Sequence, residues 1–264
     1  MTELDSFNDK LLEGTSRSFY LTLKRLPKSV KGQIGLLYLL ARISDTIADS
    51  GDSGGEDLLQ LLEDYNSRAQ GNSDSMPDFS NLSDVQENPA EGLLLRGARG
   101  PIELLEEVPV VDRELIRRCL DIIVSGQRMD LERFSDKDGS GIRSLNRYEE
   151  MDDYAYRVAG SVGEFWTEIC LEHAFEASAE MKEELMSSGV RFGKALQLIN
   201  ILRDIPEDLE IGRCYIPTDD LEKIGLSPND LLHSDSIDIF RPLLDRYIEI
   251  TEEHLDEAVR YIGL

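Results

Sequence analysis

The sequence is poor in the residues that build disulfide frameworks, zinc sites and membrane spans. Its three cysteines, Cys119, Cys170 and Cys214, are far apart, and its three histidines are equally dispersed. This scatter excludes a disulfide framework and a zinc site of ordinary spacing and fits a reducing cytoplasm. No run of about 18 apolar residues is present, so we expect no transmembrane helix. The first residues lack a basic segment followed by an apolar run, so we expect no signal peptide.

Basic residues are also scarce. The chain has 28 lysines and arginines against 53 aspartates and glutamates, which gives a net charge of −25. A protein that binds nucleic acid needs cations for the phosphate backbone, so this balance excludes nucleic acid as a partner. It also disfavours electrostatic docking on anionic lipid. We interpret most of the excess acid as the solvated surface of loops and helices.

Strand-like alternation is missing as well, whereas helical periods recur along the chain. The length and a hydrophobic content of 41% suit one domain over residues 1–264 with a substantial core. Residues 71–91 are rich in Pro, Ser, Asn and Gly, which predicts a surface loop. We expect an all-α bundle around a central cavity, with a first helix capped by Ser29. The predicted helices cover residues 29–49, 57–68, 112–134, 148–175, 177–204, 219–224 and 236–261.

Two acidic pairs stand out against this background. They are Asp45-Thr-Ile-Ala-Asp49 and Asp204-Ile-Pro-Glu-Asp208. Residues four apart lie on the same face of a helix, so each pair can direct two carboxylates at one point. Mg²⁺ prefers oxygen ligands and bridges to phosphates. Two such pairs near one mouth of the cavity would suit a diphosphate ester.

Each pair belongs to a polar stripe on an otherwise apolar helix. The first stripe consists of Tyr38, Arg42, Asp45 and Asp49, and the second of Gln197, Asn200, Asp204 and Asp208. A helix that is apolar nearly all round is expected to be buried, and buried carboxylates are costly unless they are paired or bind metal. The stripes therefore predict a lined cavity. The alternative is an amphipathic helix whose polar face meets water.

Pro206 lies inside the second pair. Because proline removes a backbone donor and clashes with the preceding turn, we expect the helix to bend or end there. Asp208 would then depart from ideal helical spacing relative to Asp204.

Arginines and glycines recur within the apolar blocks. A guanidinium binds phosphate oxygens in bidentate fashion, although each arginine could instead pair with one of the many acids. Gly160 and Gly163 have no side chains and so leave space on one face of their helix, either for an apolar tail or for close helix packing. The arginines are Arg17, Arg42, Arg157, Arg203 and Arg213.

Four blocks together resemble the squalene/phytoene synthase family, all-helical enzymes of head-to-head prenyl transfer. The blocks are Ser16-Arg-Ser-Phe19, residues 38–49, residues 154–163 and residues 197–217. The resemblance runs from about Ser16 to Leu226, and the form Asp-Thr-x-x-Asp looks more like squalene synthases. Family members usually continue beyond Leu264, so we expect their last helices to be missing here.

The resemblance implies roles for individual residues. Metal binding is expected of Asp45, Asp49, Asn200, Asp204 and Asp208. Catalysis is expected of Tyr154, Arg203, Asp45 and Asp204, with Tyr154 as acid/base or cation guide. Substrate binding is expected of Ser16, Arg17, Phe19, Tyr38, Arg42, Arg157, Gln197 and Arg213.

The resemblance also implies a reaction, in which a cytoplasmic monomer uses Mg²⁺ to join two farnesyl diphosphates. The product is a cyclopropyl diphosphate, which ionises again and is quenched by hydride from NADPH, giving squalene, or by proton loss. The sequence has no dinucleotide-binding Gly-x-Gly-x-x-Gly, which neither supports nor excludes NADPH in a helical fold. Peripheral membrane contact would serve product release.

Three alternatives remain open at this point. The same fold could make phytoene or dehydrosqualene. A terpene cyclase also carries Asn and acidic ligands at four-residue steps, but the block at residues 154–163 argues against it. The chain could also be a non-catalytic or shortened subunit of a prenyl-transfer complex.

Overall fold

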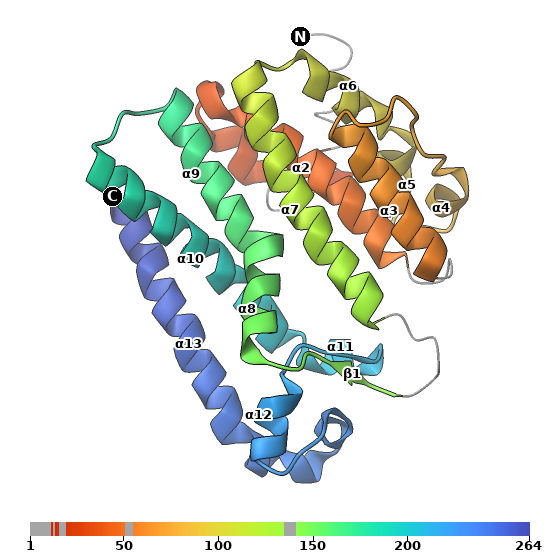
Figure 1. The fold of residues 1–264 in the computed structure, drawn as a ribbon, viewed down its shortest axis with the longest axis vertical. Coiled ribbons are helices and arrows are strands. Elements are labelled where there is room, and N and C mark those ends of the chain that lie inside the picture. Colours follow the sequence, from red (N-terminus) through yellow and green to blue (C-terminus); the bar gives the residue numbers. More distant parts are fainter. Residues whose placement is uncertain (1–11, 13, 16–19, 51–54, 135–140) are drawn as a thin grey trace. The chain divides into compact units, whose positions relative to one another are not determined.

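The computed structural model describes residues 12, 14–15, 20–50, 55–134 and 141–264. Almost all regular structure in these residues is helical (Figure 1), which confirms the all-α prediction. The chain divides into two compact units, and the boundary falls inside two helices. Unit 1 comprises residues 1–131 and 168–177, and unit 2 comprises residues 132–167 and 178–264. The single domain and the central cavity remain predictions.

Unit 1 is built around α2. This helix is apolar nearly all round, and most of its side chains are buried. It packs against α3, α5 and α6, and the buried Tyr65 of α3 donates a hydrogen bond to the Leu40 carbonyl at 2.9 Å. The helices of this unit are α2 (Lys28–Asp49), α3 (Gly55–Ala69), α4 (Ser80–Asp84), α5 (Pro89–Arg96), α6 (Arg99–Glu107) and most of α7 (Val110–Phe134).

Two predictions in unit 1 need correction. The first helix begins at Lys28 with Pro27 before it and has no side-chain cap, so Ser29 lies inside the first turn. The predicted loop at residues 71–91 contains α4 and the start of α5. Although residues 71–91 are polar on average, Phe79 within them is buried and meets the Tyr65 ring edge-on at 6.3 Å between centroids. A short helix can form there because one aromatic anchor reaches the core.

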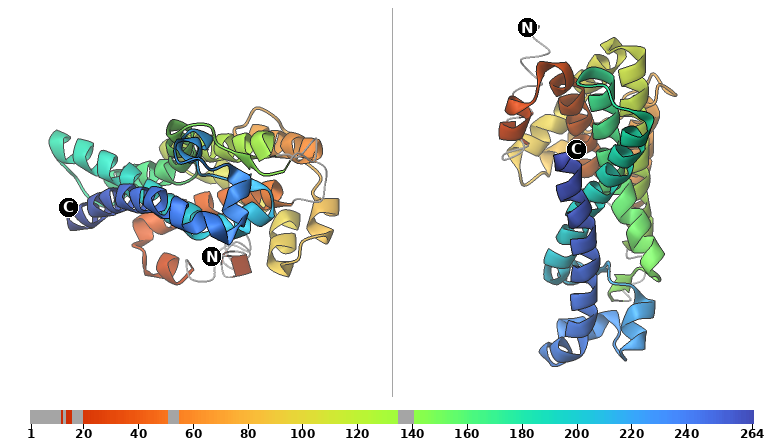
Figure 2. Two further views of the ribbon diagram at one scale, coloured as in Figure 1. Left: turned by 90° about the horizontal axis from the view of Figure 1, so that it is seen from below. Right: turned by 90° about the vertical axis from the view of Figure 1, so that its left-hand side faces the viewer.

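Unit 2 is built around α10, which lies alongside α13 (Figures 1 and 2). A single turn of π-helix, η2, joins two of its α-helices. Two strands of two residues each, β1 (Arg143–Ser144) and β2 (Arg213–Cys214), pair in parallel. The other elements are α8 (Tyr148–Ala155), η2 (Tyr156–Gly160), most of α9 (Ser161–His173), α10 (Ala179–Arg203), α11 (Ile205–Glu210), α12 (Thr218–Lys223), η3 (Pro228–Leu232), η4 (Ser234–Ser236) and α13 (Ile237–Gly263).

Glycines allow two helical segments of unit 2 to touch through their backbones. A Cβ atom on Gly163 would lie 1.9 Å from the Gly189 carbonyl oxygen, and one on Gly193 would lie 2.1 Å from the Ala159 carbonyl oxygen. Gly163 therefore serves close helix packing, the second of its two predicted uses. Among the described helices, none combines the length and apolar character that crossing a bilayer would require.

Candidate functional site

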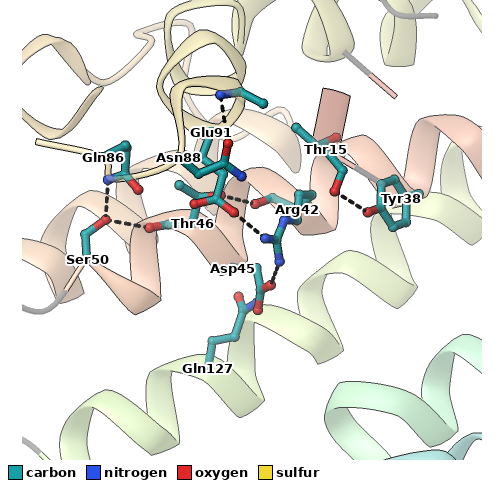
Figure 3. Close-up of polar contacts among 11 residues, drawn as sticks. Thr15, Tyr38, Arg42, Asp45, Thr46, Ser50, Gln86, Asn88, Glu91 and Gln127 are labelled. Carbon is teal, nitrogen blue, oxygen red and sulfur yellow. Dashed lines mark hydrogen bonds and ion pairs between the residues drawn. The ribbon is translucent and has the colours of Figure 1, made fainter. Parts of the chain in front are cut away.

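The first acidic motif lies on α2 in unit 1, where an arginine joins two carboxylates. Arg42 donates from Nη1 to Asp45 Oδ2 at 2.7 Å and from Nη2 to Glu91 Oε1. Figure 3 shows its guanidinium between the two acids. Glu91 belongs to the first turn of α5, which Asn88 caps by accepting a hydrogen bond from the Ala90 N–H. The arginine thus ties α2 to the start of α5.

Asp45 has polar contacts to two side chains, those of Arg42 and Gln127. Desolvation outweighs the attraction of Arg42 and raises the pKa of its carboxyl above the ordinary value. Gln127 Nε2, on α7, lies 3.5 Å from Asp45 Oδ1. The Asp45 side chain is still 43% exposed, which leaves part of the carboxylate open to a ligand.

The remaining residues of the first stripe differ in exposure. Asp49 is exposed, one turn beyond Asp45. Tyr38 is partly buried, and its hydroxyl donates to the Thr15 carbonyl at 3.3 Å. Between the two acids, the buried Thr46 hydroxyl donates to the Arg42 carbonyl at 2.8 Å, so it is satisfied within the helix.

The second acidic motif lies in unit 2, where α10 ends. Asp204 is the residue between α10 and α11, and Pro206 stands in the first turn of α11. This confirms the predicted helix end. The expected loss of spacing did not follow, because the Asp208 N–H donates to the Asp204 carbonyl at 2.8 Å, the bond of an unbroken helix. Asn200 accepts in the same way from the Asp204 N–H at 2.9 Å.

An arginine also holds the second motif. Arg203 donates from Nε and Nη2 to the two oxygens of Asp204, both at 2.6 Å. These hydrogen bonds lower the pKa of Asp204. The Asp204 side chain is 38% exposed. Further back on α10, Asn200 Nδ2 lies 3.5 Å from Gln197 Oε1.

An aromatic cluster lies in the same unit as this motif. The rings of Tyr154 and Tyr215 stack at 5.0 Å, with their hydroxyls 3.4 Å apart. Phe134 meets Tyr215 edge-on at 5.2 Å, and the Arg213 guanidinium lies 6.0 Å from the Phe134 ring. A small cavity beside the cluster is lined in part by Asp208, Arg213 and Tyr215. The cluster therefore joins two predicted site residues, Tyr154 and Arg213, to the neighbourhood of Asp208.

The other predicted substrate contacts fare differently. Arg157 donates to Asp153 at 2.8 Å, which is the ion-pair alternative considered for it. Ser16, Arg17 and Phe19 lie outside the described residues. Sequence reasoning missed Glu91, Gln127 and Tyr215. The first two are far along the chain from the motif that they contact, whereas Tyr215 falls inside a block that carried the resemblance.

The donors of both motifs suit Mg²⁺. They are carboxylates and one amide oxygen, which are the hard ligands that this ion takes, and Asp45 and Asp204 are both partly exposed. Nowhere in the described part of the chain do three His, Cys, Asp or Glu side chains form a ready metal cluster. The first motif lies in unit 1 and the second in unit 2. One metal site shared by both motifs therefore remains a prediction. What the structure establishes is two carboxylate motifs, each with one aspartate paired to an arginine.

Similar proteins were found by sequence. The chain is 28% identical over 251 residues to the 15-cis-phytoene synthase of Synechocystis sp., covering 94% of this chain and 65% of the relative. It is 32% identical over 250 residues to the bifunctional lycopene cyclase/phytoene synthase of Gibberella fujikuroi, covering 90% of this chain and 40% of the relative. The chain thus spans less than two thirds of the length of these relatives.

Solved structures share the fold. TcSQS in complex with the ligand BPH1237 superimposes with a TM-score of 0.78 at 20% identity, covering 98% of this chain and 71% of that one. The squalene synthase HpnC from Alicyclobacillus acidocaldarius gives 0.65 at 18% identity, covering 98% and 84%. The profile of the squalene/phytoene synthase family matches residues 12–264. The chain therefore belongs to the squalene/phytoene synthase family.

Proposed function

We propose that this protein catalyses Mg²⁺-dependent head-to-head condensation of two prenyl diphosphates, with release of diphosphate. The observation that carries the proposal is the pair of partly exposed carboxylate motifs, each paired with an arginine, in a chain of this family. A diphosphate is highly anionic, and oxygen ligands that hold Mg²⁺ beside guanidinium groups are the usual means of binding it.

The metal would be held by the oxygens of both motifs. These are the carboxylates of Asp45, Asp49, Asp204 and Asp208 and the amide of Asn200. When bound, Mg²⁺ neutralises charge on the diphosphate and makes it a better leaving group. Because Asp45 and Asp204 are already oriented by their arginines, little reorganisation is needed before they bind a cation.

The two arginines would change partners when substrate binds. Arg42 uses both terminal nitrogens on carboxylates, and Arg203 uses two nitrogens on Asp204. If Asp45 or Asp204 served as a Mg²⁺ ligand, the guanidinium that now donates to it would be available for the diphosphate oxygens. In this scheme each arginine orients a ligand first and contacts substrate afterwards.

The condensation itself needs a site that steers a carbocation. The C1–O bond of one prenyl diphosphate breaks, and its electron pair leaves with the diphosphate. The double bond of the second prenyl chain attacks that carbon, and loss of a proton closes the cyclopropane ring. We assign the guidance of the cation to the stacked faces of Tyr154 and Tyr215, because aromatic rings attract cations. The Tyr154 hydroxyl is our candidate acid/base.

Two products remain candidates. The Asp-Thr-x-x-Asp form of the first motif favours squalene, made from farnesyl diphosphate with NADPH as hydride donor. The names of the sequence relatives favour phytoene, which requires the longer geranylgeranyl chain and quenching by proton loss. We further propose a cytoplasmic monomer that contacts a membrane peripherally when the hydrocarbon leaves.

A product assay tests the proposal and separates these candidates. The purified chain is incubated with Mg²⁺ and either farnesyl or geranylgeranyl diphosphate, with and without NADPH, and the extracted hydrocarbon is identified by gas chromatography and mass spectrometry. Squalene that forms only with NADPH would support the first candidate. Dehydrosqualene in both tubes, or phytoene from the longer substrate, would support the second. No hydrocarbon from either substrate would contradict the activity and favour a non-catalytic subunit.

A further inference from the structure

Gln127 places a buried amide beside the acidic motif of α2. In the part of the chain that the structure describes, the buried side-chain polar atoms without a hydrogen-bond partner are Gln127 Oε1 and Arg42 Nε. Both atoms belong to side chains that contact Asp45 (Figure 3). Gln127 is only 8% exposed. Because an unpaired polar atom in the interior is unfavourable, its placement beside a carboxylate motif requires a reason.

The orientation of the amide follows from its neighbour. The Asp45 carboxylate accepts from Arg42 through Oδ2, and in its ion pair it can only accept hydrogen bonds. The NH₂ end of Gln127 must therefore face it, as Nε2 does at 3.5 Å from Oδ1. Oε1 is left as an acceptor next to the same carboxylate. A methionine of similar shape would fill this part of α7 without burying an unpaired atom, so packing alone does not explain a glutamine.

We propose that Gln127 is a positioning residue of the metal–diphosphate site. Its Nε2 holds Asp45 Oδ1, and its Oε1 accepts a hydrogen bond from a water molecule on the Mg²⁺ that Asp45 binds. Mg²⁺ dehydrates reluctantly and keeps several of its waters, which need acceptors. A neutral amide also orients Asp45 without cancelling the charge that attracts the cation, in contrast to Arg42. This inference rests on the proposed function.

The test is calorimetric titration of Mg²⁺ into the full chain in the presence of inorganic diphosphate. We expect Gln127→Met to weaken Mg²⁺ binding by about 10- to 100-fold, the usual effect of losing a partner of a metal ligand. The matched control is Gln70→Met. Gln70 is a partly buried glutamine of the same unit that donates to the Arg117 carbonyl at 2.9 Å, and its loss should leave Mg²⁺ binding unchanged.

Thermal unfolding separates a metal-linked role from a structural one. We expect Mg²⁺ with diphosphate to raise the melting temperature of the wild-type chain, and this increase to shrink in Gln127→Met. In a chain that already carries Asp45→Asn, Gln127→Met should cause no further loss of this increase in melting temperature, because Gln127 acts through Asp45. Wild-type binding that Gln127→Met leaves intact, or equal losses in both backgrounds, would overturn this inference alone. Failure of the wild-type chain to bind Mg²⁺ and diphosphate would instead contradict the proposed function.

Discussion

Arg203 grips its immediate neighbour Asp204 through two hydrogen bonds of 2.6 Å, one to each carboxylate oxygen. The pair stands where α10 ends, with Pro206 in the first turn of α11. In unit 1, Arg42 holds Asp45 three residues along the same helix. Both acidic motifs are therefore presented to a ligand as oriented ion pairs.

Removing one negative charge from either motif should abolish turnover. We expect Asp204→Asn and Asp45→Asn each to lower the rate of product formation by at least about 100-fold, because an amide is a poorer Mg²⁺ ligand than a carboxylate. The rate is measured by the product assay, and folding by the helical circular dichroism signal, which should persist.

The matched control for these variants is Asp84→Asn. Asp84 forms an exposed ion pair with Arg96 at 2.5 Å that involves no residue of either motif, and its substitution should be nearly silent. Turnover close to the wild-type rate in Asp45→Asn or Asp204→Asn would refute the metal assignment.

Tyr154→Phe separates the hydroxyl from the ring. The variant keeps the 5.0 Å stack on Tyr215 and removes the contact between the two hydroxyls at 3.4 Å. If the hydroxyl transfers a proton, product formation should fall by about 100-fold or more, with little change in the free energy of unfolding. The control is Tyr148→Phe, in which the tyrosine stacks on Tyr247 at 6.4 Å in the same unit. Equal activity of the two variants would reduce Tyr154 to a packing residue.

Local sequence patterns predicted the long helices and the two polar stripes, but not the short helices α4, α5, α6 and α11 or the partners of those stripes. The apolar surroundings of Asp45 and the position of Pro206 were enough to place α2 and the end of α10. Glu91 and Gln127 were missed because they lie 49 and 82 residues from Arg42 and Asp45. Sequence periodicity shows only which residues are neighbours on the same helix. A hydrogen bond between helices that are far apart in the sequence produces no periodic pattern.

Composition misled at the helix α4 for a related reason. The stretch around it is polar on average, yet Phe79 and Leu82 are buried and anchor it. Two apolar side chains at the right spacing decide burial, and an average over 21 residues hides them.

Because Gly163 and Gly189 are in close contact, we expect the methyl group added by Gly163→Ala to lower the free energy of unfolding strongly. Since a Cβ atom on Gly163 would lie 1.9 Å from a backbone oxygen, Gly163→Ala forces two helices apart. We expect a loss of about 3 kcal/mol in the free energy of unfolding, measured by urea denaturation. The control is Gly32→Ala on α2, where an added Cβ meets nothing within 4 Å. That variant should gain up to about 1 kcal/mol, because alanine favours the helix. Equal stabilities would contradict the close packing.

Glu150 should make the stability of unit 2 depend on pH. Desolvation acts to raise the pKa of its carboxyl, but the hydrogen bonds from the Asn146 N–H, at 2.8 Å, and from Arg133 prevail and lower the pKa to about 2. A carboxyl with a lowered folded-state pKa stabilises the protein above its unfolded-state value of 4.5. That contribution declines as the pH falls from there toward 2, because the unfolded chain then binds the proton more readily.

Glu150→Gln should accordingly cost about 2 kcal/mol of unfolding free energy at pH 7, and the difference from wild type should shrink at pH 3. Urea denaturation at both pH values measures it. Glu149→Gln, at the exposed neighbour of the same helix turn, is the control and should change little at either pH. A penalty for Glu150→Gln that is the same at pH 7 and pH 3 would show that the glutamate stabilises the start of α8 by shape and hydrogen bonding rather than by charge.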